Sequence, residues 1–302
     1  MSGSRSAIPA LLLALTFAAV GTGCAAVEDA ADGPTVAVTQ RPWAAITRTI
    51  AGDRATVLEA GAAPGIDPHL FEPDARTAAA ISDADVVVLN GVDLDHWAEE
   101  IVDGSNRNPL VVTAAEVIGA EGDPGSSDPH LWFEPDAGPA VARAVAETLT
   151  AADPDGRTTY ARGLARFLAD WQPVDDRITT TRRAAAGTTV AVTERVADRL
   201  LRALGLRIVS PTGFAVSVEE GEEPSARDTA AMNALIADRR ARVLVYNVDA
   251  ETPATEQVRT IAARRGLPVI EVTEAMPAAV DSYPAWIGRT VDTIRRALPA
   301  AP

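Results

Sequence analysis

The sequence predicts an α/β protein of two lobes, each with a roughly four-stranded parallel sheet flanked by helices, joined by one long linking helix. Short β-rich runs alternate with helical stretches along most of the chain, as they do in doubly wound folds. Several runs, such as 86–89 (VVVL), are continuously apolar, which is typical of parallel strands buried on both faces. One long stretch near the middle has no strand signal.

Eight strands are expected, four in each half of the chain. In the first half they are 35–38, 56–59, 86–90 and 110–113. In the second half they are 189–193, 207–210, 242–247 and 268–272. Pro42 suits the first turn of a helix over 41–51. Ser225, with Asp228 three residues later, predicts a cap that opens a helix over 226–240.

The strand-free stretch from Asp155 to about Ala186 is expected to be the linking helix. Its apolar residues recur at helical spacing, as in Tyr160, Leu164 and Phe167. Two helices with a turn at Pro173 are the alternative. The expected organisation is therefore a lobe over 35–154, a helix over 155–187 and a lobe over 188–302.

The first 23 residues are typical of an export signal peptide. Arg5 is the only charge before the apolar run 7–20, which is too short to cross a bilayer. The segment 20–24 (VGTGC) resembles a bacterial lipobox, although Gly21 stands where Leu or Val is usual. We therefore expect a lipid on Cys24, attachment to the outer face of the cell membrane, and a tether over 24–34. A periplasmic or secreted protein with a free thiol and a short uncleaved anchor are the alternatives.

The composition excludes several functional classes. The formal charge of −15 and the pI of about 4.6 argue against a nucleic-acid binder, whose footprint is basic. All 27 basic residues are arginine, which excludes a Schiff-base lysine and a P-loop lysine. The single cysteine excludes a disulfide framework and a CxxC zinc knuckle.

An eight-residue motif that holds two of the three histidines occurs twice. Residues 67–74 (DPHLFEPD) recur as 128–136 (DPHLWFEPD), with one extra residue. The prolines stiffen both segments, so each is expected to be a rigid loop that presents one imidazole, from His69 or His130. Two such imidazoles begin a transition-metal site. Turns that only shape and cap the next helix are the alternative. His96 lacks this context and is expected to be a surface or packing histidine.

These motifs make the chain similar to the zinc/manganese-binding solute-binding proteins of bacterial metal ABC importers. The resemblance covers Val36 to about Leu298. It implies that the chain is not an enzyme, that metal binds in the cleft between the lobes, and that His69 and His130 are ligands from the first lobe. The expected partners are the divalent ion and the membrane permease of the importer, with no nucleic acid, and the expected state is a monomer.

The resemblance also implies two ligands from the second lobe. Glu194 follows a strand and precedes a helix ending at 204–206 (LGL), which is the place of the family's third ligand. Glu274 stands where the family usually has an aspartate as its fourth ligand, and the alternatives for this ligand are Asp281 or a bridging water. Two imidazoles and two carboxylates suit Zn²⁺ or Mn²⁺ as the transported ion, with Fe²⁺ also open, because selectivity among these ions depends on geometry and availability.

Other classes of function explain the sequence less completely. A metalloenzyme would need an open coordination position, and no HExxH motif is present. Serine-hydrolase and dinucleotide-binding signatures are also missing from the sequence. A metal-binding adhesin or metal chaperone that serves no importer stays open. A binder of an organic ligand also stays open, but it would leave the paired motifs unexplained.

Overall fold

The computed structural model describes residues 33–63, 68–120 and 128–298. The expected signal peptide, Cys24 and nearly all of the tether lie outside these ranges. Among the helices within them, none combines the length and hydrophobicity needed to cross a bilayer.

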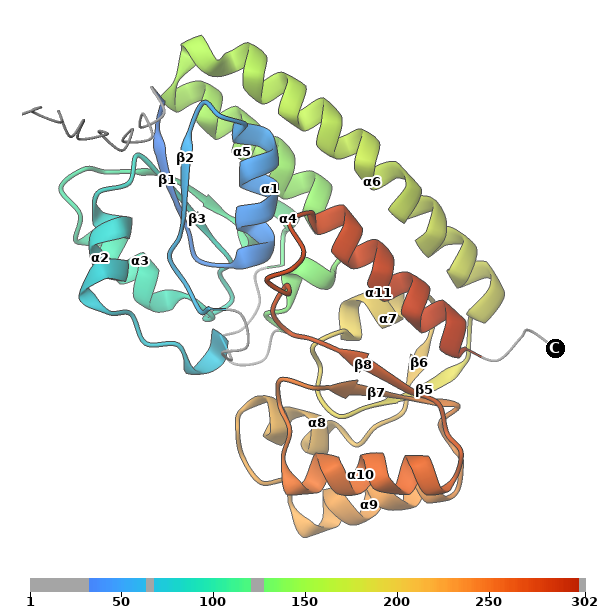
Figure 1. Ribbon diagram of the computed structural model, residues 1–302. Coiled ribbons are helices and arrows are strands. Elements are labelled where there is room, and N and C mark those ends of the chain that lie inside the picture. Colours follow the sequence, from blue (N-terminus) through green and yellow to red (C-terminus); the bar gives the residue numbers. More distant parts are fainter. Residues whose placement is uncertain (1–32, 64–67, 121–127, 299–302) are drawn as a thin grey trace, which may run out of the picture. The chain divides into compact units, whose positions relative to one another are not determined.

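Eight parallel strands form two four-stranded sheets, which confirms the predicted fold class (Figure 1). The sheet orders are β2-β1-β3-β4 and β6-β5-β7-β8. The first sheet contains β1 (Thr35–Val38), β2 (Thr56–Glu59), β3 (Val86–Leu89) and β4 (Leu110–Thr113). The second contains β5 (Thr189–Val192), β6 (Arg207–Ile208), β7 (Val243–Asn247) and β8 (Val269–Val272). In both sheets the strand order reverses beside the first strand, and such a point places a ligand crevice at the carboxyl ends of the strands.

Helices occupy the connections between strands. The first half contains α1 (Arg41–Ala51), α2 (Ala75–Ser82), α3 (His96–Asp103), α4 (Ala114–Ile118) and α5 (Ala137–Ala152). The long helix α6 (Arg157–Ala185) follows. The second half contains α7 (Asp198–Ala203), α8 (Thr212–Glu219), α9 (Ala226–Ala237), α10 (Pro253–Arg264) and α11 (Tyr283–Ala297). Short 3-10 turns lie at Pro68–Leu70, Leu131–Phe133 and Pro154–Gly156.

Several predicted elements are one to four residues shorter than expected, including the linking helix, and the ends of β6 and α9 have identifiable causes. Strand β6 ends at Ile208, because the Ser210 hydroxyl bonds the backbone of Val192 and Pro211 has no N–H to continue the ladder. Helix α9 ends at Ala237, and Arg239 has a left-handed φ of 54°. The expected cap of α9 is present, since the Ser225 hydroxyl accepts the Asp228 N–H at 3.1 Å.

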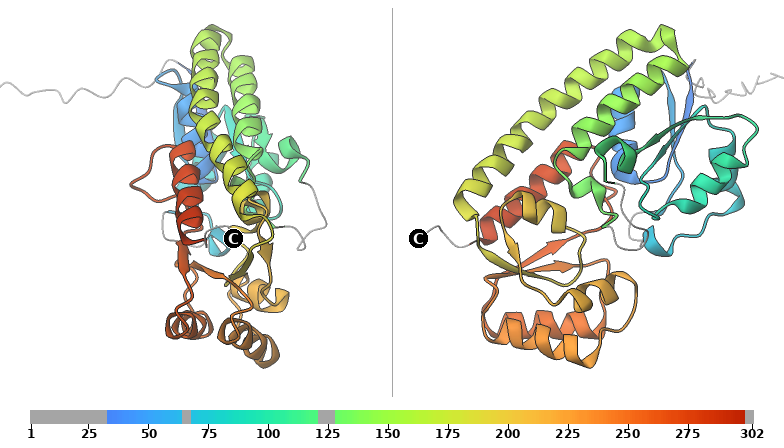
Figure 2. Two further views of the ribbon diagram at one scale, coloured as in Figure 1. Left: turned by 90° about the vertical axis from the view of Figure 1, so that its right-hand side faces the viewer. Right: turned by 180° about the vertical axis from the view of Figure 1, so that it is seen from behind.

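Side chains alternate between the two faces of each sheet, and the buried ones form three hydrophobic clusters. Val36 and Val88 of the first sheet, with Val190 and Val245 of the second, belong to one hydrophobic cluster shared by both sheets. The opposite faces pack separately: α2 and α3 cover the first sheet, and α8, α9 and α10 cover the second. Figure 2 shows these outer layers from two further sides. The two sheets therefore share the central cluster, and each has a separate cluster on its other face.

Helix α6 runs unbroken through Pro173, so the single linking helix is confirmed and the alternative of two helices is wrong. It packs against α1 and α5 and then against α11. Gly163 makes the first contact possible, because a Cβ there would lie 2.5 Å from the Ile50 carbonyl oxygen. Near the middle, Trp171 stacks on Tyr283 of α11 with ring centroids 5.5 Å apart. The Tyr283 hydroxyl donates to the Trp132 carbonyl at 2.8 Å, which ties α11 to the first half of the chain.

Candidate metal centre

Three potential ligands converge where loops from the two sheets meet. His69 lies in the 3-10 turn Pro68–Leu70, and His130 directly precedes the turn Leu131–Phe133. Glu274 is the second residue after β8. Each of these three side chains offers one ligand atom, and the three atoms lie within 4.8 Å of one another.

The separations match one face of a coordination tetrahedron. Glu274 Oε1 lies 3.1 Å from His130 Nε2 and 3.3 Å from His69 Nε2, and the two Nε2 atoms are 3.5 Å apart. Ligand atoms about 2.0–2.2 Å from a tetrahedral zinc lie about 3.3–3.6 Å from each other. One ion can therefore contact all three atoms with little movement of the side chains.

His130 is held in place by Asp128, two residues earlier in the same motif. Asp128 Oδ1 accepts the backbone N–H of His130 at 3.0 Å and lies 2.8 Å from its Nδ1. This bond places the proton on Nδ1 and leaves Nε2 as the metal-binding atom. The imidazole is completely buried.

A polar residue at the end of β3 fixes the loop that carries His130. Asn90 donates from Nδ2 to the Pro129 carbonyl at 2.9 Å and accepts the indole N–H of Trp43 at 3.0 Å. The carboxylate of Asp95, fully buried, accepts the backbone N–H groups of Asn90 and Gly91 at 2.6 and 2.9 Å. The loop is therefore bonded to the sheet before any metal binds.

Glu194 lies near the three-atom cluster but outside it. It follows β5, its residue is only 2% exposed, and its Oε2 accepts the Nδ2 of Asn247 at 2.7 Å. Asn247 Oδ1 accepts the N–H of Asp249, whose Oδ2 accepts the N–H of Glu274 at 2.9 Å. One chain of hydrogen bonds thus connects the two glutamates.

The protonation states of these groups are strongly perturbed. Burial raises the pKa of Glu194 to about 8, and the charge of Glu274 adds to the effect. Burial also acts to raise the pKa of Glu274, but hydrogen bonds from His130 and His69 outweigh it and hold the value at about 2. Burial opposes the charged form of His130, yet its bonds to Asp128 and Glu274 raise its pKa well above the usual value. The metal-free cluster therefore stores protons on His130 and Glu194.

Arg199 of α7 joins the second half of the chain to the His130 loop. Its Nη2 donates to the Asp128 carbonyl at 2.6 Å, and its Nε lies 3.5 Å from Asp128 Oδ2. The guanidinium is mostly buried, with 18% of the side chain exposed. Arg199 therefore holds Asp128, which in turn orients His130.

His69 is the candidate ligand nearest to solvent, with 22% of its side chain exposed. It borders a hollow of about 150 Å³ that is also lined by Val92 and Pro129. Val92 has a φ of 56°, which is strained for a β-branched residue. His69 is therefore the one of the three candidate ligands that lines this hollow.

The structure places the other candidates away from these atoms. Asp281 is exposed and lines a separate pocket with Arg41 and Met276, so it is not beside the histidines. The side chain of His96 is 64% exposed and pairs with Glu99 and Glu100 on α3. Asp67 and the segment 121–127 lie outside the described residues.

The residues that support the ligands were not predicted from the sequence. The role of Asp128 was not assigned, although it belongs to the repeated motif. Asn90 and Asn247 carry a signal that was available, because each stands at the carboxyl end of the third strand of its half. Arg199 carried no such signal.

Comparison with known proteins gives a consistent result. The family described as zinc-uptake complex component A, periplasmic, matches residues 36–297. A manganese ABC transporter substrate-binding lipoprotein of Streptococcus gordonii is 27% identical over 186 residues, covering 58% of this chain and 60% of that protein. A zinc-binding lipoprotein of Streptococcus pneumoniae is 26% identical over 182 residues, covering 55% and 36%. The alignments thus span between about a third and three-fifths of these relatives.

Solved structures share the fold. The periplasmic zinc-binding protein of Treponema pallidum aligns with a TM-score of 0.73 and 22% identity, over 88% of this chain and 99% of that one. The laminin-binding protein of Streptococcus agalactiae, described as having adhesin and metal-transporting activity, aligns with a TM-score of 0.74 and 21% identity, over 88% and 100%.

Proposed function

The chain belongs to the zinc-uptake complex component A family, and on this basis we propose that it captures a divalent transition metal and delivers it to an ABC importer. The observation that carries the proposal is the convergence of His69, His130 and Glu274. The ligand set proposed is these three residues and Glu194. The transported ion is Zn²⁺ or Mn²⁺, since relatives named for either metal match the chain.

The arrangement suits capture and release. Ligands arrive from loops of both sheets, so a bound ion gains contacts only when the two halves hold their closed relation. The shared core and α6 restrict that relation to small movements. No catalytic role is proposed, because four protein ligands would fill a tetrahedral shell and leave no position for an activated water.

The remaining features of the proposal concern location and assembly. A lipid on Cys24 and a tether through residue 34 would hold the protein at the outer face of the cell membrane, close to the permease. The protein would act as a monomer. A metal-binding adhesin or a metal chaperone would use the same metal site and would differ from an importer component only in the partner that it serves. An organic ligand is disfavoured, because the hollow beside His69 is about 150 Å³ and sites for such ligands are about 300–1,000 Å³.

A competitive titration tests the proposal. The chelator-stripped protein is titrated with Zn²⁺ and Mn²⁺ and followed by elemental analysis and thermal shift. One equivalent of ion with clear stabilisation is expected, and the relative affinities show which ion the site serves. His69→Ala and His130→Ala should each weaken binding at least about tenfold, because each removes a ligand. His96→Ala is the control and should bind normally; equal losses in all three variants would reject the site.

A further inference from the structure

Exposed arginines gather at the amino ends of the strands of the second sheet, on the side opposite the metal centre. This arginine edge consists of the arginines in segments 182–183, 207, 239–242 and 264–265. Arg207 opens β6 and segment 239–242 directly precedes β7. Segments 182–183 and 264–265 lie at the ends of helices α6 and α10, which lead into β5 and β8. In a parallel sheet these starts share one edge, so eight guanidinium groups gather there.

The charge of the arginine edge is not balanced locally. None of its arginines forms an ion pair with any residue that the structure describes. No acid lies within its segments, and Asp238 adjoins one of them, in a chain whose formal charge is −15. At the matching edge of the first sheet, by contrast, Arg54 pairs with Asp153 at 2.7 Å and Arg107 with Asp85 at 2.8 Å.

Helix dipoles explain only part of this excess. Helices α6, α7, α9 and α10 end at the arginine edge, and Ala297 at the end of α11 lines the same cavity as Arg239. A helix carboxyl end carries about half a negative charge, so the five ends and Asp238 together offset about three or four of the eight positive charges. The surplus requires a negative partner or a solvated counterion layer.

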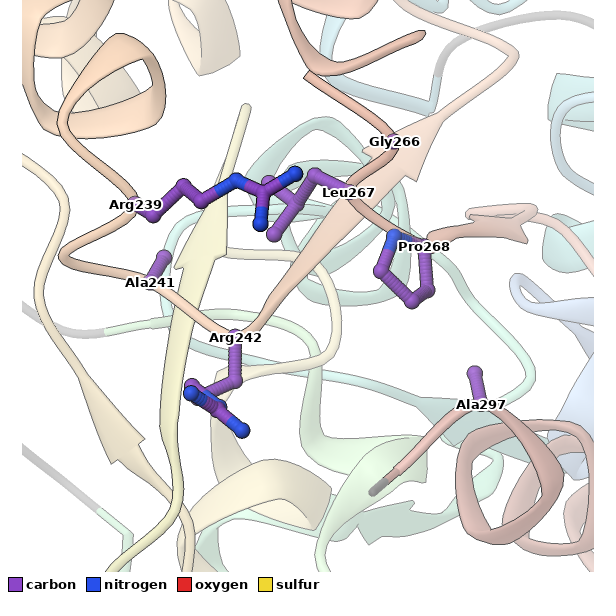
Figure 3. Close-up of a pocket in the computed structure, with 7 residues that line it drawn as sticks. All are labelled: Arg239, Ala241, Arg242, Gly266, Leu267, Pro268 and Ala297. Atoms are coloured by element: carbon purple, nitrogen blue, oxygen red, sulfur yellow. The ribbon is translucent and has the colours of Figure 1, made fainter.

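A hollow in the arginine edge suits a phosphate ester. Arg239, Arg242, Leu267 and Pro268 line a cavity of about 250 Å³ (Figure 3). Figure 3 shows the Arg239 side chain extending toward Leu267. Its Nη2 donates to the Arg265 carbonyl, which limits its freedom. Guanidinium groups bind phosphate oxygens with two donors, and the apolar residues can contact the carbon chain of the ester.

We propose that the arginine edge docks on the anionic phospholipid headgroups of the membrane. It is a broad basic surface on an acidic protein, so attraction to a negative bilayer acts there while the rest of the body is repelled. The strands run from this edge toward Glu194 and Glu274, so docking leaves the metal centre open.

Vesicle binding tests this inference with a chain that carries no lipid. The chain from residue 24 onward with Cys24→Ser is mixed with vesicles of phosphatidylglycerol and phosphatidylcholine, or of phosphatidylcholine alone, and sedimented. Binding is expected only to the anionic vesicles and should weaken as salt is added. The triple variant Arg183→Gln, Arg240→Gln and Arg264→Gln should bind about a hundredfold more weakly, at about fivefold for each arginine.

A matched control distinguishes the effect of the arginine edge on vesicle binding from the effect of net charge. Arg76, Arg143 and Arg166 are exposed and lie outside the arginine edge. Their triple change to Gln alters the net charge equally and should reduce vesicle binding less than about threefold. Equal losses in the two triple variants would overturn the inference. Binding to soluble polyphosphate without binding to anionic vesicles would also overturn it. Zn²⁺ titration of the same chains gives an independent readout of the metal centre.

Discussion

Metal binding should release about two protons at neutral pH. The metal-free centre holds one proton on His130, whose pKa is raised, and one on Glu194, whose pKa is about 8. A carboxylate and a neutral imidazole are the forms that bind metal, so both protons must leave. At pH 7, Glu194 with a pKa of about 8 is roughly nine-tenths protonated.

The magnitude follows from the number of protons. Each displaced proton changes the apparent affinity about tenfold per pH unit, so two protons give about a hundredfold between pH 6.5 and 7.5. Affinity rises with pH, because the raised pKa values favour the protonated forms at the lower end. The pH dependence of the affinity becomes weaker above about pH 8, because Glu194 is then already ionised before metal binds.

Calorimetric titration in buffers of different ionisation enthalpy counts the protons directly. We expect close to two protons per Zn²⁺ for the unaltered protein and close to one for Glu194→Gln, in which that proton cannot be released. Release of fewer than one proton by the unaltered protein would refute the assigned protonation states. A single proton, unchanged in Glu194→Gln, would remove Glu194 from the ligand set.

Three further predictions concern the partner of His130, the choice of the carboxylate ligand and the packing of α6. Asp128→Ala should lower metal affinity about ten- to a hundredfold, as measured by competition with a chromogenic chelator, because the imidazole loses its orienting partner; an unaltered affinity would contradict this role. Glu274→Gln should weaken binding in the same assay far more than Asp281→Asn, and the reverse order would move the ligand. Gly163→Ala should destabilise the fold by about 1–3 kcal/mol in urea unfolding, because its Cβ would meet the Ile50 carbonyl at 2.5 Å; an unchanged midpoint would show that α6 can shift.

The fold was predictable because its signals are local. The strands are short apolar runs, and the spacing of Tyr160 and Phe167 shows one helix across the middle of the chain. The ends of β6 and α9 were less predictable, because a Ser210 side-chain bond and the left-handed Arg239 decide them. These contacts depend on neighbours that the local pattern does not reveal.

The site was predictable only in part. The repeated motif indicated His69 and His130, and the family resemblance was needed for Glu194 and Glu274. The chain of bonds from Asn247 through Asp249 joins residues that lie far apart in the sequence, so no local pattern shows it. The bond from Arg199 to the Asp128 carbonyl spans 71 positions for the same reason.

A crystal structure of the metal-loaded protein, with anomalous data collected at the zinc and manganese edges, would locate and identify the bound ion. We expect one ion bound by His69 Nε2, His130 Nε2 and Glu274 Oε1, with Glu194 completing the shell. An ion bound elsewhere, or one that contacts neither histidine, would contradict this expectation.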